Sequence, residues 1–238
     1  MNRCSDYVGH YTIDAEQFDY FANQDPTDAA YEQLFHRFIL KLAGRHSTVV
    51  DIGSGGGWTS AIPHDMIAFV DLSKKNLSAL KSMSSGPVLA DAHRLPFMDE
   101  SVEFVVASEI VEHLNEPEAA AREIWRILRP GGKAIISTPY KERIRYTLCI
   151  HCNKMTPWNS HLHSFDASKL FSLFPDGTRK DIYVFGSKLL TLFRAARVFR
   201  KLPLWIWRCL DYPLVRFFDK AQHIVIVVEK AKTFSTGA

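Results

Sequence analysis

The chain has 238 residues, of which 47% are hydrophobic and 23% are charged, and its formal net charge is only +3. This composition is that of a globular protein with a sizeable core, and the small net charge argues against a nucleic-acid-binding protein. Four cysteines do not make a disulfide scaffold at this length, and the polar, acidic N-terminus lacks the apolar core of a signal peptide. No stretch reaches the roughly 18 uncharged apolar residues of a membrane span. We therefore expect a cytoplasmic protein.

Helical and strand patterns alternate along most of the chain. A helix is expected over 26–44, where apolar side chains recur at helical spacing and Gly44 provides a stop. Short apolar strands are expected at 48–52, 67–71, 86–90, 102–107, 133–138, 179–186 and 223–229, with helices at 73–83 and 116–129. This alternation predicts an α/β fold with a seven-stranded, mostly parallel sheet and helices on both faces.

Polar residues stand where the predicted parallel strands end. The first strand ends in Asp51 and runs into a glycine-rich turn, "DIGSGGG", which leaves backbone amides open to a ligand. The second strand ends in Asp71, at a distance from the turn where an acid commonly accepts hydrogen bonds from ribose hydroxyls. Ligands of open α/β sheets bind at the carboxyl ends of the strands. We therefore expect these residues, with Asp91 and Glu109 after the next two strands, to surround one crevice.

Three stretches within roughly residues 45 to 140 stand out: "DIGSGGG", "DAHRLPFMDESVEFVVASEIVEHL" and "ILRPGGKAIISTPY". Together they resemble class I S-adenosylmethionine-dependent methyltransferases, in the type 11-like group whose members methylate small molecules. The resemblance implies a Rossmann-like fold with an antiparallel last strand, an enzyme, and S-adenosylmethionine as cofactor. A nicotinamide cofactor also uses a glycine turn and a ribose acid, but the later motifs fit the methyltransferases. The cofactor is a cation without phosphate, which suits acidic strand ends.

The same resemblance assigns a set of cofactor-binding residues. They are Asp51, Gly53, Ser54, Gly55, Gly57, Asp71, Leu72, Asp91, Ala92 and Ser108. The glycine turn would lie against the methionine part, and Asp51 would help hold its amino group. Asp71 would bind the ribose hydroxyls, and Asp91 would accept from the adenine amino group.

Several residues are candidates for activating the acceptor. Glu109, Glu112 and His113 would share one face if a helix begins there. Their E-x-x-E-H spacing resembles quinone-pathway O-methyltransferases, in which it can hold a divalent cation. The alternative is that Glu112 caps or pairs at the helix surface and His113 packs under the cofactor. The candidate catalytic residues are Glu109, His113, His161 and His163, the last two in a "SHLHSF" stretch that resembles a loop near the acceptor pocket of relatives.

Cys149 and Cys152 have the spacing of zinc ligands, and His161 and His163 follow within reach. Two thiolates and two imidazoles would complete a tetrahedral zinc site that staples this long loop. His-x-His is not the usual zinc spacing, however. A metal-free loop in which one of these histidines faces the substrate is therefore the alternative.

A basic, aromatic segment precedes the last strand. Between residues 187 and 220 it carries eight Lys or Arg and two Asp. Arg194, Arg197 and Lys201 would share one helical face, which is typical of helices that lie on anionic membranes. The alternative is a helical lid over the sheet. We therefore expect either peripheral membrane contact through 187–220, at the inner face of the membrane, or a lid.

These patterns predict one methyltransferase domain over residues 1–238. Its parts are a helical cap (1–47), a cofactor-binding core (48–140), a Cys/His loop region (141–178), a basic amphipathic helical insertion (187–221) and the last strand (222–230). The predicted function is methyl transfer to oxygen, nitrogen or carbon of a small-molecule or lipid-linked acceptor. The alternative is an S-adenosylmethionine-binding regulatory or assembly protein without turnover.

Overall fold

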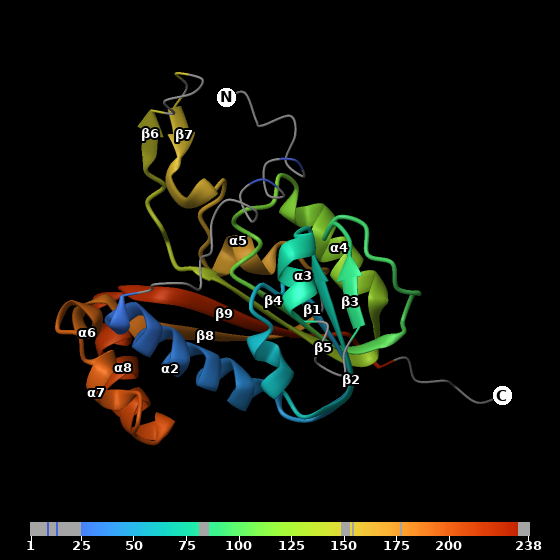
Figure 1. The fold of residues 1–238 in the computed structure, drawn as a ribbon. Helices are drawn as coiled ribbons and strands as arrows, with labels where there is room; N and C mark the ends of the chain where they lie inside the picture. Colours follow the sequence, from blue (N-terminus) through green and yellow to red (C-terminus); the bar gives the residue numbers. More distant parts are fainter. Residues whose placement is uncertain are drawn as a thin grey trace.

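A seven-stranded sheet forms the centre of the computed structural model, which describes residues 9, 13, 25–80, 86–148, 153, 155–176 and 178–232 (Figure 1). The strands are β1 (His46–Ile52), β2 (His64–Asp71), β3 (Gly86–Leu89), β4 (Val102–Ser108), β5 (Leu128–Pro139), β8 (Arg179–Ser187) and β9 (Ala221–Glu229). Their order is β3-β2-β1-β4-β5-β9-β8. The pairs among β1 to β5 are parallel, whereas β9 is antiparallel to both β5 and β8. The expected α/β sheet is confirmed.

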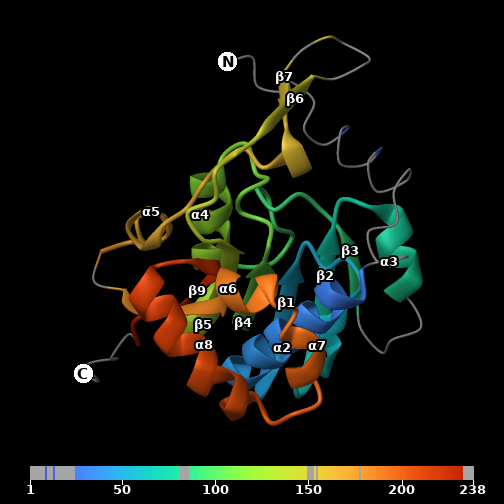
Figure 2. The ribbon, with the colours of Figure 1, turned by 90° about the vertical axis from the view of Figure 1, so that its left-hand side faces the viewer.

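Helices cover both faces of this sheet, which explains the continuous apolar runs of its central strands. Neighbouring residues of a strand point to opposite faces, and both Val105 and Val106 of β4 are fully buried. Val105 belongs to the core beneath α4 (Pro117–Ile127) and α5 (Ala167–Phe171). Val106 belongs to the core beneath α2 (Pro26–Ala43), α7 (Ala196–Phe199) and α8 (Leu204–Phe218). Figures 1 and 2 show these two groups of helices on opposite sides of the sheet.

The helix expected over 26–44 is α2, which begins and ends at the residues that cap it. The side chain of Asp25 accepts a hydrogen bond from the Thr27 amide at 2.7 Å, and Gly44 ends the helix with a φ of 73°. The helix expected over 73–83 is α3 (Lys74–Leu80), and residues 81–85 lie outside the described part. Two short 3₁₀ helices, η1 (Trp58–Ala61) and η2 (Trp158–Ser160), complete the elements near the site described below.

The boundary between α4 and β5 differs from the predicted one. The helix ends at Ile127, and β5 begins at Leu128 rather than at 133. Gly131 donates its amide hydrogen to the Lys230 carbonyl at 2.9 Å, and the Lys230 amide donates to the Gly132 carbonyl at 2.9 Å. The Pro-Gly-Gly sequence, read as a helix stop, therefore continues the strand because its backbone pairs with the chain just after β9.

A short hairpin occupies part of the predicted Cys/His loop region. It consists of β6 (Tyr146–Leu148) and β7 (Met155–Pro157), which pair with each other and not with the central sheet. Figures 1 and 2 show it standing away from the sheet. Cys149 and Cys152 lie outside the described residues.

The basic segment forms three helices, α6 (Lys188–Leu192), α7 and α8, instead of one amphipathic helix. Arg194 has a φ of 53°, which helices do not tolerate, so it separates α6 from α7. Arg194, Arg197 and Lys201 therefore do not share one helical face. Trp207 of this segment is fully buried in the core.

A buried carboxylate holds α8 to the end of β8. Asp211 is fully buried and accepts hydrogen bonds from the backbone amides of Ser187 at 2.6 Å and Gly186 at 3.2 Å. Arg208, one turn earlier on α8, lies 3.0 Å from the same carboxylate. In the part of the chain that the structure describes, no helix is both long enough and apolar enough to cross the bilayer.

Gly186→Ala should lower the free energy of unfolding by about 2–5 kcal/mol. Gly186 has a φ of +80°, and an added Cβ would lie 2.1 Å from the Tyr31 hydroxyl oxygen. Urea unfolding followed by circular dichroism measures the effect. Gly86→Ala is the matched control, because its Cβ would meet no atom within 4 Å. Equal stability of the two variants would contradict the tight packing of β8 against α2.

Candidate functional site

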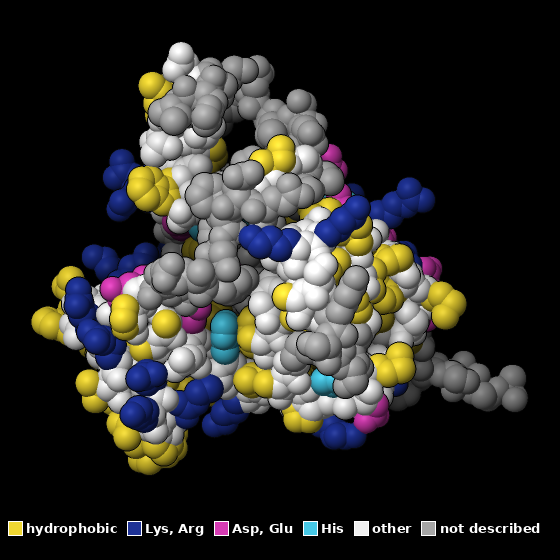
Figure 3. All heavy atoms as spheres, viewed as in Figure 1, with side chains coloured by type: hydrophobic (Ala, Val, Ile, Leu, Met, Phe, Trp, Pro, Cys, Tyr) yellow, Lys and Arg dark blue, Asp and Glu magenta, His cyan; other side chains and the backbone are white. Residues whose placement is uncertain are grey.

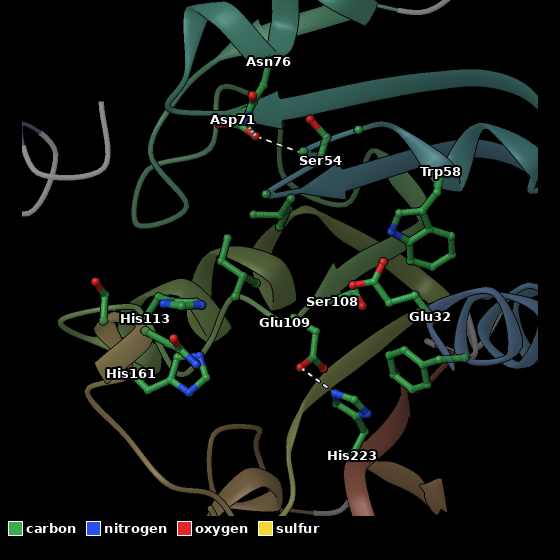
Figure 4. Close-up of a pocket in the computed structure, with 18 of the residues that line it drawn as sticks. Glu32, Ser54, Trp58, Asp71, Asn76, Ser108, Glu109, His113, His161 and His223 are labelled. Carbon is green, nitrogen blue, oxygen red and sulfur yellow. Dashed lines mark hydrogen bonds and ion pairs between the residues drawn. The ribbon is translucent and has the colours of Figure 1, made fainter. Parts of the chain in front are cut away.

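A cavity of about 1190 Å³ opens at the edge of the sheet where the parallel strands end (Figure 4). Its walls come from the glycine turn after β1, the ends of β2 and β4, the first turns of α2, the start of β9 and the segment 157–161. Ligand pockets usually measure about 300–1,000 Å³. The cavity therefore has room for a cofactor together with a second molecule.

The described Asp, Glu, Lys and Arg residues that line the cavity are all acidic. Among the described residues that line it, Asp25, Asp28, Glu32, Asp71 and Glu109 are acidic, and none is Lys or Arg. One histidine of the lining, His36, stacks on Trp58 with ring centroids 4.0 Å apart, and burial lowers its pKa from 6.5 to about 4. His36 is therefore neutral at pH 7. A cationic ligand fits these walls better than a phosphorylated one.

The glycine turn is fixed against the end of β2. Gly53 has a φ of 71°, and its amide donates to the Val70 carbonyl at 2.8 Å. A Cβ at this position would lie 2.7 Å from the Ile110 side chain. The Gly55 amide donates to the carboxylate of Asp71 at 3.0 Å, drawn as a dashed line in Figure 4. Bare backbone therefore faces the cavity, as the sequence predicts.

The predicted cofactor residues divide into two groups by position. Those that line the cavity are Gly53, Ser54, Gly55, Asp71, Leu72, Ala92 and Ser108. Asp51, Gly57 and Asp91 are not among the residues that line it. The Asp91 carboxylate accepts from the His93 amide at 2.9 Å and lies 2.6 Å from the His93 ring. Burial acts to raise the pKa of Asp91, but the hydrogen bonds from His93 outweigh it and hold the pKa below its usual value.

Asp51 is buried beneath the glycine turn and is 3% exposed. The Thr59 hydroxyl, from η1, donates to its carboxylate at 2.5 Å. Burial, opposed by this hydrogen bond, raises the pKa of Asp51 from 3.8 to about 7. The side chain thus connects β1 to η1 below the turn and has no counter-cation in the described part of the chain.

Glu109 follows β4 in a strained conformation. Its φ is 55°, which is unusual for a residue with a side chain, and its amide donates to the Ser137 carbonyl at 3.0 Å. One carboxylate oxygen accepts from the Ser137 hydroxyl at 2.8 Å, and the other lies 3.1 Å from Nε2 of His223. Burial acts to raise the pKa of Glu109, but His223 and Ser137 outweigh it, so the pKa lies below its usual value.

His223 and Tyr31 extend this contact into a chain of three side chains. Nδ1 of His223 lies 2.8 Å from the Tyr31 hydroxyl, and the imidazole stacks on Phe35 at 4.4 Å. Glu109, His223 and Tyr31 all line the cavity. Burial raises the pKa of Tyr31 well above 10, so its hydroxyl stays protonated. Figure 4 shows Glu109 and His223 turned toward each other.

Sequence reasoning missed His223, although a signal existed. It is the third residue of "AQHIVIVVE", and β9 runs antiparallel to the other strands. An antiparallel strand begins at the edge where its parallel neighbours end, so polar residues at its start reach the same crevice. Tyr31 had no comparable signal, because it fits the apolar face of α2.

The E-x-x-E-H residues do not lie on one helical face, because they form a turn before α4. The His113 amide donates to the Ile110 carbonyl, and Glu109 points to His223 instead of joining Glu112. Glu112 is 1% exposed; burial and the nearby charge of Glu109 raise its pKa well above its usual value. Glu112 therefore lies beneath the site rather than at a helix surface.

A different group of described residues could hold a metal ion. One ligand atom from each of Glu112, His113 and His161 lies within 4.8 Å of the others. His161 lines the cavity, and its Nδ1 lies 2.5 Å from the Glu142 carboxylate. His163 is not in this group, and its Nε2 lies 2.9 Å from the Leu114 carbonyl oxygen. The two histidines predicted as a zinc pair thus have separate surroundings.

Part of the chain is similar in sequence to known methyltransferases. Residues 50–136 match a family model described as a methyltransferase domain. The ubiquinone/menaquinone biosynthesis C-methyltransferase UbiE of Desulfotalea psychrophila is 27% identical over 128 residues, 48% of this chain and 52% of that protein. An uncharacterized methyltransferase of Mycolicibacterium gilvum is 31% identical over 131 residues, 52% of this chain and 51% of that protein. The chain therefore spans about half the length of the curated relatives it matches.

Solved structures support the same fold. A S-adenosylmethionine-dependent methyltransferase from Archaeoglobus fulgidus superposes with a TM-score of 0.59 and 17% sequence identity. The match covers 93% of this chain and 100% of that chain. The similarity of fold thus extends beyond residues 50–136.

Proposed function

Residues 50–136 belong to the class I S-adenosylmethionine-dependent methyltransferases, and we propose that the chain transfers a methyl group from this cofactor to a small-molecule acceptor. One observation carries the proposal: an acidic cavity, without Lys or Arg among its described lining, at the strand ends beside a glycine turn. S-adenosylmethionine carries a sulfonium and an ammonium group and no phosphate. The acidic lining favours such a cation over a nucleotide phosphate.

The cofactor is proposed to lie between the glycine turn and the end of β4. The backbone of Gly53 and Gly55 would contact its methionine part, and Asp71 would accept from the ribose hydroxyls. Ala92 would contact the adenine and Ser108 the methionine end. Asp51 supports the turn from below in this arrangement, and its charge acts on the ammonium group across the backbone.

Methyl transfer to a hydroxyl or an amine also needs a destination for the acceptor's proton. When the hydrogen of His223 is on Nε2, the Glu109 carboxylate, 3.1 Å away, accepts a hydrogen bond from it. Nδ1 of His223 then accepts from the Tyr31 hydroxyl. An acceptor that hydrogen-bonds to the Tyr31 oxygen can give its proton to Tyr31 while Tyr31 passes its own to His223. Glu109 stabilises the imidazolium that results.

Zinc has no part in this proposal. Cys149 and Cys152 lie outside the described residues, and Nε2 of His163 lies within hydrogen-bond distance of the Leu114 carbonyl oxygen. Glu112, His113 and His161 are the described residues that would hold a divalent cation, close to the acceptor end of the cavity. The proton path above does not pass through them.

Asp71→Ala should weaken S-adenosylmethionine binding by about 1.5–3 kcal/mol, which is roughly ten- to a hundredfold in Kd. Calorimetry on the purified chain measures this change. Asp65→Ala is the matched control, because Asp65 lies near the start of β2 at the opposite edge of the sheet, 60% exposed beside Arg45. An unchanged Kd for the Asp71 variant would refute the proposed cofactor position.

Turnover distinguishes the enzyme from a regulatory protein that only binds the cofactor. Labelled S-adenosylmethionine is incubated with the chain and fractionated cell extract, and methylated products are separated by chromatography. A labelled product whose yield at limiting cofactor falls in the Asp71 variant supports methyl transfer. Tight cofactor binding without any labelled product supports the regulatory alternative.

A further inference from the structure

The three helices of the basic segment expose large apolar side chains, and we call this region the α6–α8 surface (residues 188–220). Its most exposed apolar side chains are Phe217 (83%), Leu192 (75%), Phe193 (73%), Val198 (68%) and Trp205 (63%). Soluble monomers rarely gather so many large apolar groups on one surface unless it makes contact with something. Figure 3 shows hydrophobic side chains interleaved with Lys and Arg at its lower left, where these helices lie.

The apolar side chains of α8 divide into two faces with different roles. Leu204, Trp207 and Val215 follow helical spacing, are buried, and pack in the core. Trp205 and Tyr212 lie on the outward face and are 63% and 52% exposed. The inward face is sufficient to attach α8 to the sheet. The outward aromatic residues therefore serve another purpose.

Backbone contacts hold the helices of this surface together. The Lys188 amide, at the start of α6, donates to the Lys220 carbonyl after α8 at 3.1 Å. Arg37 of α2 donates to the carbonyls of Arg200 and Leu202, at 2.7 and 2.9 Å, and so fixes the turn between α7 and α8. The helices that carry the exposed groups are thus held in fixed relative positions.

The α6–α8 surface has a net positive charge, because it carries eight Lys or Arg and only two Asp, both of which are paired. Asp211 is buried against Arg208, and Asp219 lies 2.5 Å from Lys141. Seven cations remain exposed: Lys188, Arg194, Arg197, Arg200, Lys201, Arg216 and Lys220. Exposed aromatic groups among exposed cations match the interface of an anionic bilayer, where rings enter the headgroup region and cations meet lipid phosphates.

We propose that the α6–α8 surface docks on an anionic lipid membrane. A second copy of the chain is a poorer occupant, because a symmetric contact would place the same cations against each other. The docking is independent of the proposed function and is measured without turnover. Its position has a consequence for the site, since β8 ends and β9 begins at the edge where the cavity opens. A docked chain would hold the cavity close to the lipid headgroups.

Co-sedimentation of the full chain with vesicles tests the proposal. We expect binding to phosphatidylcholine vesicles that contain about 30 mol% phosphatidylglycerol, weakening as salt rises, and no binding to pure phosphatidylcholine. The triple variant Arg194→Gln, Arg197→Gln, Lys201→Gln should lower the partition coefficient about a hundredfold, at about fivefold per cation. Phe193→Ser with Phe217→Ser should weaken binding without changing the melting temperature.

Two controls make the result specific to this surface. Lys74→Gln with Lys75→Gln removes exposed cations of α3, and Met98→Ser removes a side chain that is 78% exposed elsewhere. Both should bind vesicles as the unaltered chain does. Brominated lipids should quench tryptophan emission, and Trp205→Phe should remove the part of that quenching that comes from the α6–α8 surface, because Trp207 is buried.

Three outcomes would overturn the proposal. The first is equal binding to neutral and anionic vesicles, and the second is an unchanged partition coefficient for the triple variant. The third is a dimer in lipid-free sedimentation velocity that Phe217→Ser dissociates, because the surface would then be a contact between copies of the chain.

Discussion

Replacing His223 by Asn should lower kcat for methyl transfer by about 10²–10⁴-fold, while the Kd for S-adenosylmethionine changes less than about twofold. The imidazole lies between the Glu109 carboxylate at 3.1 Å and the Tyr31 hydroxyl at 2.8 Å. Without it, a proton leaving the acceptor has no path from Tyr31 to a base. Asn leaves the cofactor wall intact, because that wall comes from the glycine turn and β2 on the other side of the cavity.

The readout must separate catalysis from packing, because His223 also stacks on Phe35. Steady-state kinetics should show the loss in kcat and not in KM. Tyr31→Phe should reproduce most of the loss, since it removes the hydroxyl and keeps the ring. His64→Asn is the control, because His64 lies at the start of β2, bonded to the Ile62 carbonyl. Native kcat in the His223 variant would exclude this proton path.

The strands were predictable from sequence because helices cover both faces of the sheet. Each strand is therefore buried on both sides and appears as a run of apolar residues. All seven expected strands exist, with ends that differ by a few residues, as for β2, which begins at His64 rather than 67. The predicted start of β5 was wrong, because backbone pairing between Gly132 and Lys230, 98 positions later in the chain, extends the strand toward its N-terminus. Long-range backbone pairing of this kind leaves no local trace in the sequence.

The residues proposed to bind the cofactor were predictable from the order of the strands, whereas the contacts of Glu109 and Glu112 were not. Gly53, Gly55 and Asp71 follow their strands directly, so chain direction alone brings them to one edge. Glu109 and Glu112 required the local conformation, and the turn there sends one carboxylate to His223 and buries the other. The sequence predicted a basic segment rich in aromatic residues. Only the packing of the helices shows that Trp207 lies in the core and Trp205 on the surface.

Asp51→Asn should raise the free energy of unfolding at pH 8 by on the order of 4 kcal/mol and leave it nearly unchanged at pH 4. Burial raises the pKa of Asp51 from 3.8 to about 7. Between those pH values the folded chain keeps a proton that the unfolded chain has lost. The free energy of unfolding therefore falls as pH rises from about 4 to 7, and stays low above 7. Asn cannot ionise, so the variant lacks this decrease.

Asp91→Asn provides a control of opposite sign. Hydrogen bonds from His93 lower the pKa of Asp91, so its charge stabilises the fold above the usual pKa and that contribution disappears as pH falls. The Asp91 variant should be less stable than the native chain at pH 8 and should converge with it in acid. Urea unfolding at a series of pH values measures both. Parallel curves for the native chain and the Asp51 variant would refute the raised pKa.

A carboxylate that destabilises the fold at neutral pH calls for a ligand that benefits from its charge. The proposed cofactor supplies an ammonium group above the glycine turn, and such a cation favours the ionised form of Asp51. Binding should then lower the pKa of Asp51 and release a proton. The Kd for S-adenosylmethionine should therefore decrease as pH rises through 7 in the native chain and stay flat in the Asp51 variant. Calorimetry in two buffers of different ionisation enthalpy counts the proton directly, and no proton release near pH 6.5 would separate Asp51 from cofactor binding.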